Sequence, residues 1–403
     1  MPTFSSKSTE CILEYLSRPV QSWLFGAGIS FSAGIPLIAE MTRKIHESIS
    51  KDATYSGSYL AVVQDMPGDE IGKSWHVETL LTHLVDLMSV ANRRKSQDVA
   101  VGNPLKAVSK ASLEDLHKEI RRRIVGYVDP WCSGDSASKK ALSIQQHRSF
   151  FSSLNNAISV ERNRRRILIA TTNYDTLLED AAHLEGCTVA DGFSGGSVGC
   201  WRPRESFGPG MYDSHDLGIV KLHGSIDWYK NGQLFTRKRI GIDYFEEGKG
   251  DIFIYPQATK YMETQLDPFS LLIDTFRAFL CGANAVTANK DVTLGVCGYS
   301  WGDEHINRII FSALLENARL TVISFNDVVP PAVSQWQSSI SVGATPNNGS
   351  AERLIVAHAK GISHAGGKGD VQFTGDADWW RFDGLSRFIE SHSVQIKEAD
   401  VKP

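Results

Sequence analysis

The sequence has few cysteines, and none of them are paired at short spacing. Among 403 residues there are 6 cysteines, and no two of them form a CxxC pattern. A structural zinc site usually draws its ligands from such pairs, so we expect no bound metal. In a reducing compartment, scattered cysteines are small core or surface residues rather than disulfide partners.

Long apolar runs and an excess of positive charge are also absent. No apolar run reaches the roughly 18 residues that a membrane span needs. Glu10 and Glu14 interrupt what would be the apolar part of a secretory signal. The net charge is −4, whereas chains that bind nucleic acid directly are usually basic. We therefore expect a cytoplasmic protein that contacts no membrane and meets nucleic acid only through a partner.

The chain does contain apolar strands that alternate with amphipathic helices. Five strands are predicted, at 23–25, 167–170, 218–222, 291–296 and 320–325. Helical spacing of apolar residues predicts helices near 8–18, 75–92, 112–128, 142–160, 176–184, 266–282 and 301–317. This alternation is typical of an α/β fold with a Rossmann-like, doubly wound parallel sheet.

A helix-rich stretch separates the first two predicted strands and suggests the domain organisation. Residues 1–36 begin the Rossmann-like core, 37–150 form a helical insertion lobe, and 151–330 complete the core. Residues 331–403 are expected to be a C-terminal extension that serves assembly. Its cluster Trp379-Trp380-Arg381-Phe382 fits either core packing or an interface, because aromatic and arginine side chains anchor interfaces.

The first predicted strand ends in the glycine-rich segment Phe25-Gly-Ala-Gly-Ile-Ser30. Closely spaced glycines let the main chain approach a pyrophosphate, and Ser30 adds a hydroxyl donor. Position 31 is Phe, so the segment departs from the GxGxxG pattern of dinucleotide-binding folds. A tight turn from strand to helix explains the segment equally well.

Polar residues follow the next two predicted strands as well. Asn173 carries both a donor and an acceptor, which suit a ribose hydroxyl or a water. Asp175 either joins the same site or caps the helix that follows. His223 ends its strand, where an imidazole can act as a general base near neutral pH, although a lone histidine is more often structural.

The last two predicted strands end in Gly298, Ser300 and Asn326. Ser300 and Asp303 have the spacing of a capping box for the next helix, and the Asn326 amide could bind a ribose. In open α/β sheets, ligands bind at the carboxyl ends of the strands. The five polar clusters therefore predict one site along that edge.

Taken in this order, the clusters resemble the sirtuin family. The matching stretches are 26–36, 172–175, 223–224 and 298–300. The variants LHGSIDW and GYSWGDEHIN are most similar to a sirtuin-like branch of bacterial antiphage defence, which includes Thoeris effectors and subunits paired with HerA-type ATPases. Unlike protein-deacylating sirtuins, the chain lacks two cysteine pairs for zinc, and it has Leu37-Ile38-Ala39 where they have Asp-Phe-Arg.

The resemblance implies an NAD⁺ glycohydrolase that releases nicotinamide and ADP-ribose, with NAD⁺ as its substrate and without a metal. It implies that Asn173 orients the ribose or a water and that His223 activates a hydroxyl or a water. The implied cofactor-binding residues are Gly26, Ala27, Gly28, Ser30, Asp175, Gly298, Ser300 and Asn326. Asp303 is a weaker candidate because capping already explains it.

Other functions stay open at this point. They are an NAD⁺-dependent deacylase, an ADP-ribosyltransferase, and a non-catalytic sensor of NAD⁺ or an ADP-ribose derivative. The missing cysteines argue against a deacylase, and the presence of both Asn173 and His223 favours catalysis over sensing. An enzyme that drains NAD⁺ is toxic to its own cell. We therefore expect control by assembly, either into a homo-oligomer or with a HerA-type ring ATPase.

Overall fold

The computed structural model describes residues 7–68, 70–128, 143–158, 164–231, 234–238, 251–254, 267–341, 349–364 and 370–399. The chain divides into two compact units. The first unit comprises 1–33, 143–222 and 271–403, and the second comprises 34–142 and 223–270. The chain therefore leaves the first unit and returns to it twice.

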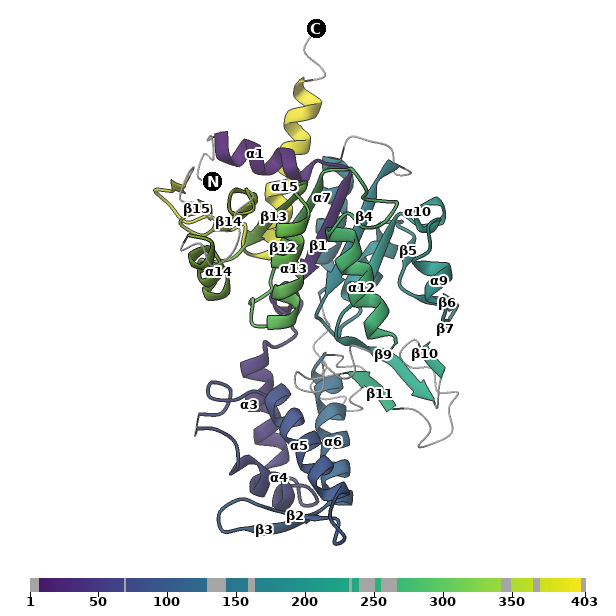
Figure 1. The fold of residues 1–403 in the computed structure, drawn as a ribbon, viewed down its shortest axis with the longest axis vertical. Helices are drawn as coiled ribbons and strands as arrows, with labels where there is room; N and C mark the ends of the chain where they lie inside the picture. The colour runs from purple at the N-terminus through teal and green to yellow at the C-terminus, as the bar shows by residue number, and fades with distance from the viewer. Residues whose placement is uncertain are drawn as a thin grey trace. The chain divides into compact units, whose positions relative to one another are not determined.

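In the first unit, nine strands form one sheet in the order β16-β15-β14-β13-β12-β1-β4-β8-β5 (Figure 1). Neighbouring strands from β14 to β5 are parallel, whereas β15 and β16 are antiparallel additions at one edge. The prediction of a doubly wound parallel sheet is confirmed. The strand bounds are β1 (Val20–Phe25), β4 (Arg166–Thr171), β5 (Val189–Ala190), β8 (Leu217–Lys221), β12 (Val292–Cys297), β13 (Leu320–Phe325), β14 (Leu354–His358), β15 (Gly361–His364) and β16 (Val371–Gln372).

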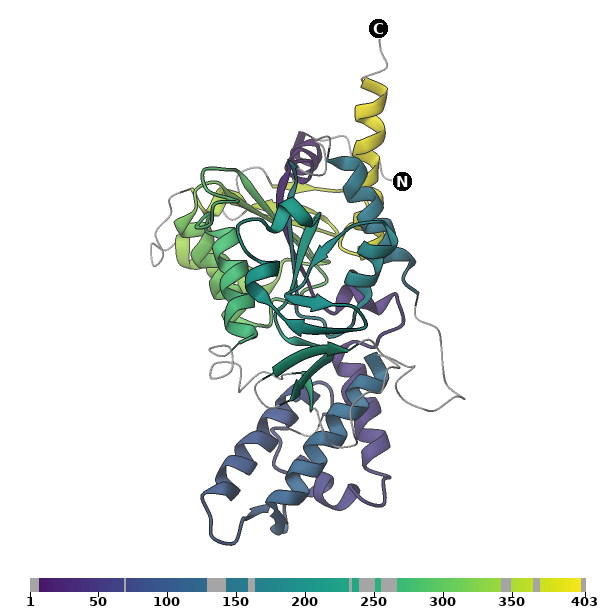
Figure 2. The same cartoon turned by 90° about the vertical axis from the view of Figure 1, so that its right-hand side faces the viewer.

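Helices cover both faces of this sheet, which is why its central strands are almost continuously apolar. Figure 2 shows α12 (Phe269–Leu280) and α13 (Glu304–Glu316) on one face, with α7 (Gln145–Ala157) and α15 (Phe382–Ala399) on the other. The second face also receives apolar side chains from α1 (Lys7–Leu16) and α8 (Leu177–Leu184).

Aromatic rings join the sheet to the helices on this second face. The ring centroid of Phe25 lies 5.1 Å from that of Phe150 and 5.4 Å from that of Phe382. Trp379 and Phe382 are both buried, and Trp379 Nε1 donates to the carbonyl oxygen of His358 at 3.0 Å. Of the two alternatives for the cluster at 379–382, core packing is therefore correct for these two aromatics.

The C-terminal residues behave differently from the extension that we expected. β14 pairs in parallel with β13, β15 and β16 continue the sheet, and α15 packs against α7. α14 (Pro331–Ser341) precedes these strands. The described residues beyond 330 thus complete the fold of the first unit. β15 and β16 have only four and two residues and carry little signal in the sequence, because pairing with a neighbour decides whether such short strands form. β14 is an apolar run as long as β8, and the sequence analysis missed it.

The Gly, Ser, Pro and Asp content of residues 191–216 predicts a long loop, but these residues contain short elements. These are β6 (Phe193–Gly195), β7 (Val198–Trp201), α9 (Pro203–Ser206) and α10 (Met211–Ser214). A further short helix, α2 (Gly28–Phe31), lies earlier in the first unit. β6 and β7 pair as an antiparallel hairpin, whose Phe193 and Trp201 rings lie 5.1 Å apart. Each element is four residues or shorter, which is below the length at which hydrophobic periodicity can be recognised.

The second unit is mainly helical, but its bounds differ from the predicted lobe at 37–150: it ends at 142, and it also includes 223–270, which we expected in the core. It contains α3 (Ile38–Ile49), α4 (Ser56–Val63), α5 (Val77–Asn92), α6 (Lys110–Val128) and the hairpin of β2 (Asp98–Val101) and β3 (Lys106–Ser109). It also contains β9 (Gly224–Asn231), which pairs with β10 (Leu234–Lys238) and β11 (Asp251–Ile254). Throughout the described residues, no helix combines the length and hydropathy that crossing a bilayer requires.

Candidate functional site

Two glycine-rich segments pack against each other at the carboxyl edge of the main sheet. The Gly26 N–H donates to the Cys297 carbonyl oxygen at 3.3 Å, and the Gly28 N–H donates to that of Gly298 at 2.9 Å. A Cβ on Gly26 would lie 2.6 Å from the Gly298 oxygen, and a Cβ on Gly28 would lie 2.7 Å from the Gly298 Cα. Close approach of the two segments therefore requires glycine at 26 and 28.

This packing affects how the segment after β1 could bind a pyrophosphate. The N–H groups of Gly26 and Gly28 already donate to protein carbonyl oxygens, so they are not the donors for an anion in this structure. Ala27 lies between them and is exposed. The N–H groups of Ile29 and Ser30 also donate to carbonyl oxygens of this segment. The predicted contact with a pyrophosphate thus depends on Ala27 rather than on the glycine amides.

Three buried polar side chains connect the end of β1 to the end of β4. Ser30 Oγ donates to Asp175 Oδ2 at 2.8 Å, and Asn173 Nδ2 donates to Ser30 Oγ at 3.0 Å. Ser30 is 1% exposed, and Asn173 and Asp175 are each 6% exposed. A hydroxyl carries a single hydrogen, so that of Ser30 is committed to the carboxylate and not to a phosphate.

The chemistry of these partners sets the orientation of the Asn173 amide. An ionised carboxylate only accepts hydrogen bonds, so Ser30 must donate to Asp175 and must accept from its other neighbour. The Asn173 amide nitrogen is the group that can donate to Ser30. The amide oxygen of Asn173 is then the atom left for a ribose hydroxyl or a water.

The N-cap of α8 is Thr176, so Asp175 is not the N-cap that was its alternative in the sequence, although its carboxylate contacts the start of the helix. Its Oδ1 accepts a hydrogen bond from the N–H of Leu177, the first residue of α8, at 3.1 Å. One carboxylate therefore satisfies a free amide at the helix start and holds the Ser30 hydroxyl. The Asp175 carboxylate therefore links the start of α8 to Ser30, which lies 145 positions away in the chain.

A buried ion pair lies beside this network, and sequence reasoning missed it. Lys221, the last residue of β8, is 2% exposed and lies 3.2 Å from Glu179 Oε1 on α8. Its Nζ also donates to the main-chain oxygen of Asp175. A lysine at the end of an otherwise apolar strand, directly before Leu222 and His223, was the available signal.

His147 is a second buried group that the sequence did not single out. It lies on α7 with no exposed surface, and its ring centroid is 5.0 Å from that of Phe382. Neither ring nitrogen has a hydrogen-bond partner within the described part of the chain. Burial lowers the pKa of His147 to about 4, although the charge of Asp175 acts in the opposite direction. The imidazole is therefore neutral near pH 7.

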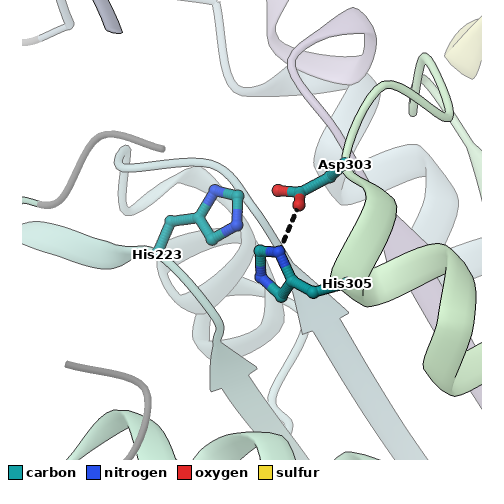
Figure 3. Close-up of side chains that lie close together, drawn as sticks. All are labelled: His223, Asp303 and His305. Atoms are coloured by element: carbon teal, nitrogen blue, oxygen red, sulfur yellow. Dashed lines mark ion pairs between the residues drawn. The ribbon is translucent and has the colours of Figure 1, made fainter. Parts of the chain in front are cut away.

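The predicted capping box of Ser300 and Asp303 is not present in the loop between β12 and α13. α13 begins at Glu304, its N-cap is Asp303, and the Asp303 side chain makes no capping hydrogen bond. Asp303 Oδ1 instead lies 2.7 Å from His305 Nδ1, a contact drawn in Figure 3. The Ser300 hydroxyl accepts from the Gly302 N–H at 3.3 Å. The helix starts too late for Ser300 to serve as its N-cap.

Trp301 stabilises this loop in an uncommon main-chain conformation. Its φ angle is +59°, a region that bulky residues rarely adopt. Trp301 Nε1 donates to Ser324 Oγ at 2.9 Å, and Asn307 Nδ2 donates to the Trp301 carbonyl oxygen at 2.8 Å. The indole also stacks on Phe311, with centroids 5.7 Å apart. These contacts hold the loop that carries Ser300.

Asn326, predicted to hold a ribose, connects the ends of β12 and β13. Its Nδ2 donates to the Tyr299 carbonyl oxygen at 3.3 Å, and its Oδ1 accepts from Ser324 Oγ at 2.5 Å. Asn326 remains half-buried. Its amide is engaged with the neighbouring loop, and its contact with a ribose stays a prediction.

His223 lies on the two-residue connection between β8 and β9. It is the first residue of the second unit. Chain connectivity keeps its main chain at the carboxyl end of β8, two residues beyond Lys221. Its predicted role as a general base stays a prediction.

Part of the chain is similar to a known protein family. Residues 167–337 match the family model described as a SIR2-like domain. The matched stretch contains Asn173, Asp175 and His223, together with the loops after β12 and β13. No curated protein matches the chain.

Matches to solved structures extend over most of the chain, at low identity and low TM-score. One, from work on the mechanism and regulation of Sir2 enzymes, is 11% identical with a TM-score of 0.39, and the match covers 98% of this chain and 99% of that chain. A complex of a Sir2 homologue with NAD is 10% identical with a TM-score of 0.36, covering 97% and 94%. A structure from work on sirtuin substrate affinity is 10% identical with a TM-score of 0.34, covering 83% and 98%.

Proposed function

We propose that this protein is an NAD⁺ glycohydrolase whose reacting ribose lies at the carboxyl edge of the main sheet. The observation that carries the proposal is the hydrogen bond from Asn173 to Ser30, at 3.0 Å. It joins the end of β4 to the glycine-rich segment, which is itself packed on Gly298. Parts of three of the four stretches that resemble sirtuin motifs thus meet within one unit. The SIR2-like match over 167–337 supports an NAD-related function for this edge.

The proposed reaction breaks the bond between the ribose C1′ and the nicotinamide nitrogen. The pyridinium leaves as neutral nicotinamide, and positive charge develops on the ribose ring in an oxocarbenium-like transition state. The Asn173 amide oxygen accepts a hydrogen bond from a ribose hydroxyl or from the attacking water. His223 takes the proton that the water releases as its oxygen bonds to C1′. The products are nicotinamide, ADP-ribose and one proton.

We further propose that the activity serves antiphage defence in the cytoplasm and is controlled by assembly. The resemblance to defence-associated sirtuin-like proteins supports this proposal. The assembly is a homo-oligomer or a complex with a HerA-type ring ATPase. By the same resemblance, we propose that Ser300 and Asn326 hold the adenosine half of NAD⁺ and that Gly298 belongs to the cofactor-binding segment.

The experiment that tests the function measures nicotinamide release from NAD⁺ by chromatography. Asn173→Ala and His223→Ala should each lower the rate by about 100-fold or more, as expected for loss of a group that orients or deprotonates water. Asn92→Ala, an exposed asparagine at the end of α5, is the matched control. Folding of each variant is checked by circular dichroism.

Three experimental outcomes would contradict the proposed function or its site assignment. Wild-type rates in both variants would show that the site assignment is wrong. Binding of NAD⁺ without turnover, under every assembly condition tested, would favour a sensor. Transfer of labelled ADP-ribose to a protein acceptor, or removal of an acyl group from one, would favour a transferase or a deacylase.

A further inference from the structure

A buried lysine, Lys221, lies outside the predicted site and contacts the main chain of the segment that contains Asn173 and Asp175. The Lys221 ammonium donates to the Asp175 carbonyl oxygen and pairs with Glu179 at 3.2 Å. The side chain is 2% exposed. Removing a cation from water is costly unless it is paired and hydrogen-bonded. Both partners of Lys221 belong to the segment that follows β4.

We infer that Lys221 is a positioning residue for Asn173, an inference that rests on the proposed function. The ammonium fixes the main chain at Asp175, two residues beyond Asn173. The Asp175 carboxylate can then hold the Ser30 hydroxyl, which in turn accepts from the Asn173 amide. Lys221 thus acts through Asp175 and Ser30, without touching NAD⁺ itself.

The strand register explains why a residue on β8 can have this effect. Thr171, at the end of β4, is paired with Lys221, at the end of β8. The Asn173 N–H donates to Thr171 Oγ1 at 3.0 Å, and Thr171 Oγ1 donates to the Phe25 carbonyl oxygen at 3.1 Å. The main chain near Asn173 is therefore held from the β1 side by Thr171 and from the β8 side by Lys221.

Glu179 and Asp175 have separable roles as partners of Lys221. The Glu179 carboxylate neutralises the buried cation, whereas the Asp175 carbonyl oxygen transmits its position to the site. Glu179→Gln should therefore lower the unfolding temperature while kcat stays within about threefold of wild type. Lys221→Met removes both contacts, and we expect kcat to fall by at least about 10-fold, because small misplacements of a reacting group are costly. KM for NAD⁺ should change by less than about threefold.

The test adds a readout that needs no activity. Hydrogen exchange should be faster in Lys221→Met at the amides of Asn173 and Leu177, which are bonded to Thr171 Oγ1 and Asp175 Oδ1. Lys290→Met, at an exposed lysine of the same unit, is the matched control. If Lys221→Met does not fold, Lys221→Met with Glu179→Met replaces it, because removing both charges leaves no buried ion unpaired.

The outcomes separate this inference from the proposed function. A folded Lys221→Met protein with wild-type kcat, or with wild-type exchange at these two amides, would overturn the positioning role. An equal fall in kcat in Glu179→Gln would overturn it as well, because loss of the ion pair alone would then account for the effect. If the wild-type protein releases no nicotinamide, the proposed function fails, and the exchange data still decide whether Lys221 orders this segment.

Discussion

His147 should make the first unit less stable in mild acid. Its pKa is lowered from 6.5 to about 4 in the folded chain, because the side chain is buried away from water. Between these two values the unfolded chain binds a proton that the folded chain does not. Stability is therefore fully present above pH 6.5 and falls as the pH decreases towards 4.

The size of the effect follows from the same two values. One pKa unit corresponds to about 1.4 kcal/mol. On lowering the pH from about 7.5 to about 5, titration of His147 should remove about 2 kcal/mol from the free energy of unfolding. His147→Phe retains a ring against Phe382 and removes the titration. His147→Gln removes the titration and retains a polar side chain.

The assay is urea unfolding of wild type and both variants, followed by circular dichroism at several pH values in this range. The quantity of interest is the difference in free energy of unfolding between wild type and variant, since other titrating groups cancel in it. We expect this difference to shift by about 2 kcal/mol in favour of the variants as the pH falls. A difference that stays constant within about 0.5 kcal/mol would refute the account of His147 as a buried neutral imidazole.

Two further predictions concern the glycine packing and assembly. Gly28→Ala places a Cβ 2.7 Å from the Gly298 Cα, so it should lower the free energy of unfolding by about 1–3 kcal/mol and reduce the melting temperature. The control, Gly196→Ala, has nothing within 4 Å of the added Cβ and should be nearly neutral. Equal melting temperatures of the two variants would contradict the packing argument. Size-exclusion chromatography with light scattering should detect an oligomer or a complex with a ring ATPase as the active form, and full NAD⁺ hydrolysis by an isolated monomer at micromolar concentration would count against control by assembly.

Much of the first unit could be predicted because its strands are local patterns. β1, β4, β8, β12 and β13 are short apolar runs that end in glycine or polar residues. A parallel strand that is buried on both faces has this pattern whatever its neighbours are. The edge at which Asn173 and Gly298 lie also follows, because parallel strands bring their carboxyl ends to the same side of a sheet.

Helix capping was harder to predict, because the residue at which a helix begins decides which side chain is the N-cap. Ser300 and Asp303 have the spacing of a capping box, yet α13 begins at Glu304, and the Asp303 carboxylate pairs with His305. The spacing of two residues does not show which of them is the N-cap. That depends on the main-chain path of the loop, which Trp301 holds at a positive φ.

The sequence by itself determined the class of fold and the polar residues at the strand ends, because both depend on neighbours within about ten positions. Only the tertiary structure decided what those residues do for one another. Ser30 and Asp175 are 145 positions apart, and Lys221 reaches Asp175 across 46. The use of the Ser30 hydroxyl, the direction of the Asn173 amide and the partner of the buried lysine are set by which strands lie side by side. Strand pairing depends on packing of the whole sheet, which no local pattern contains.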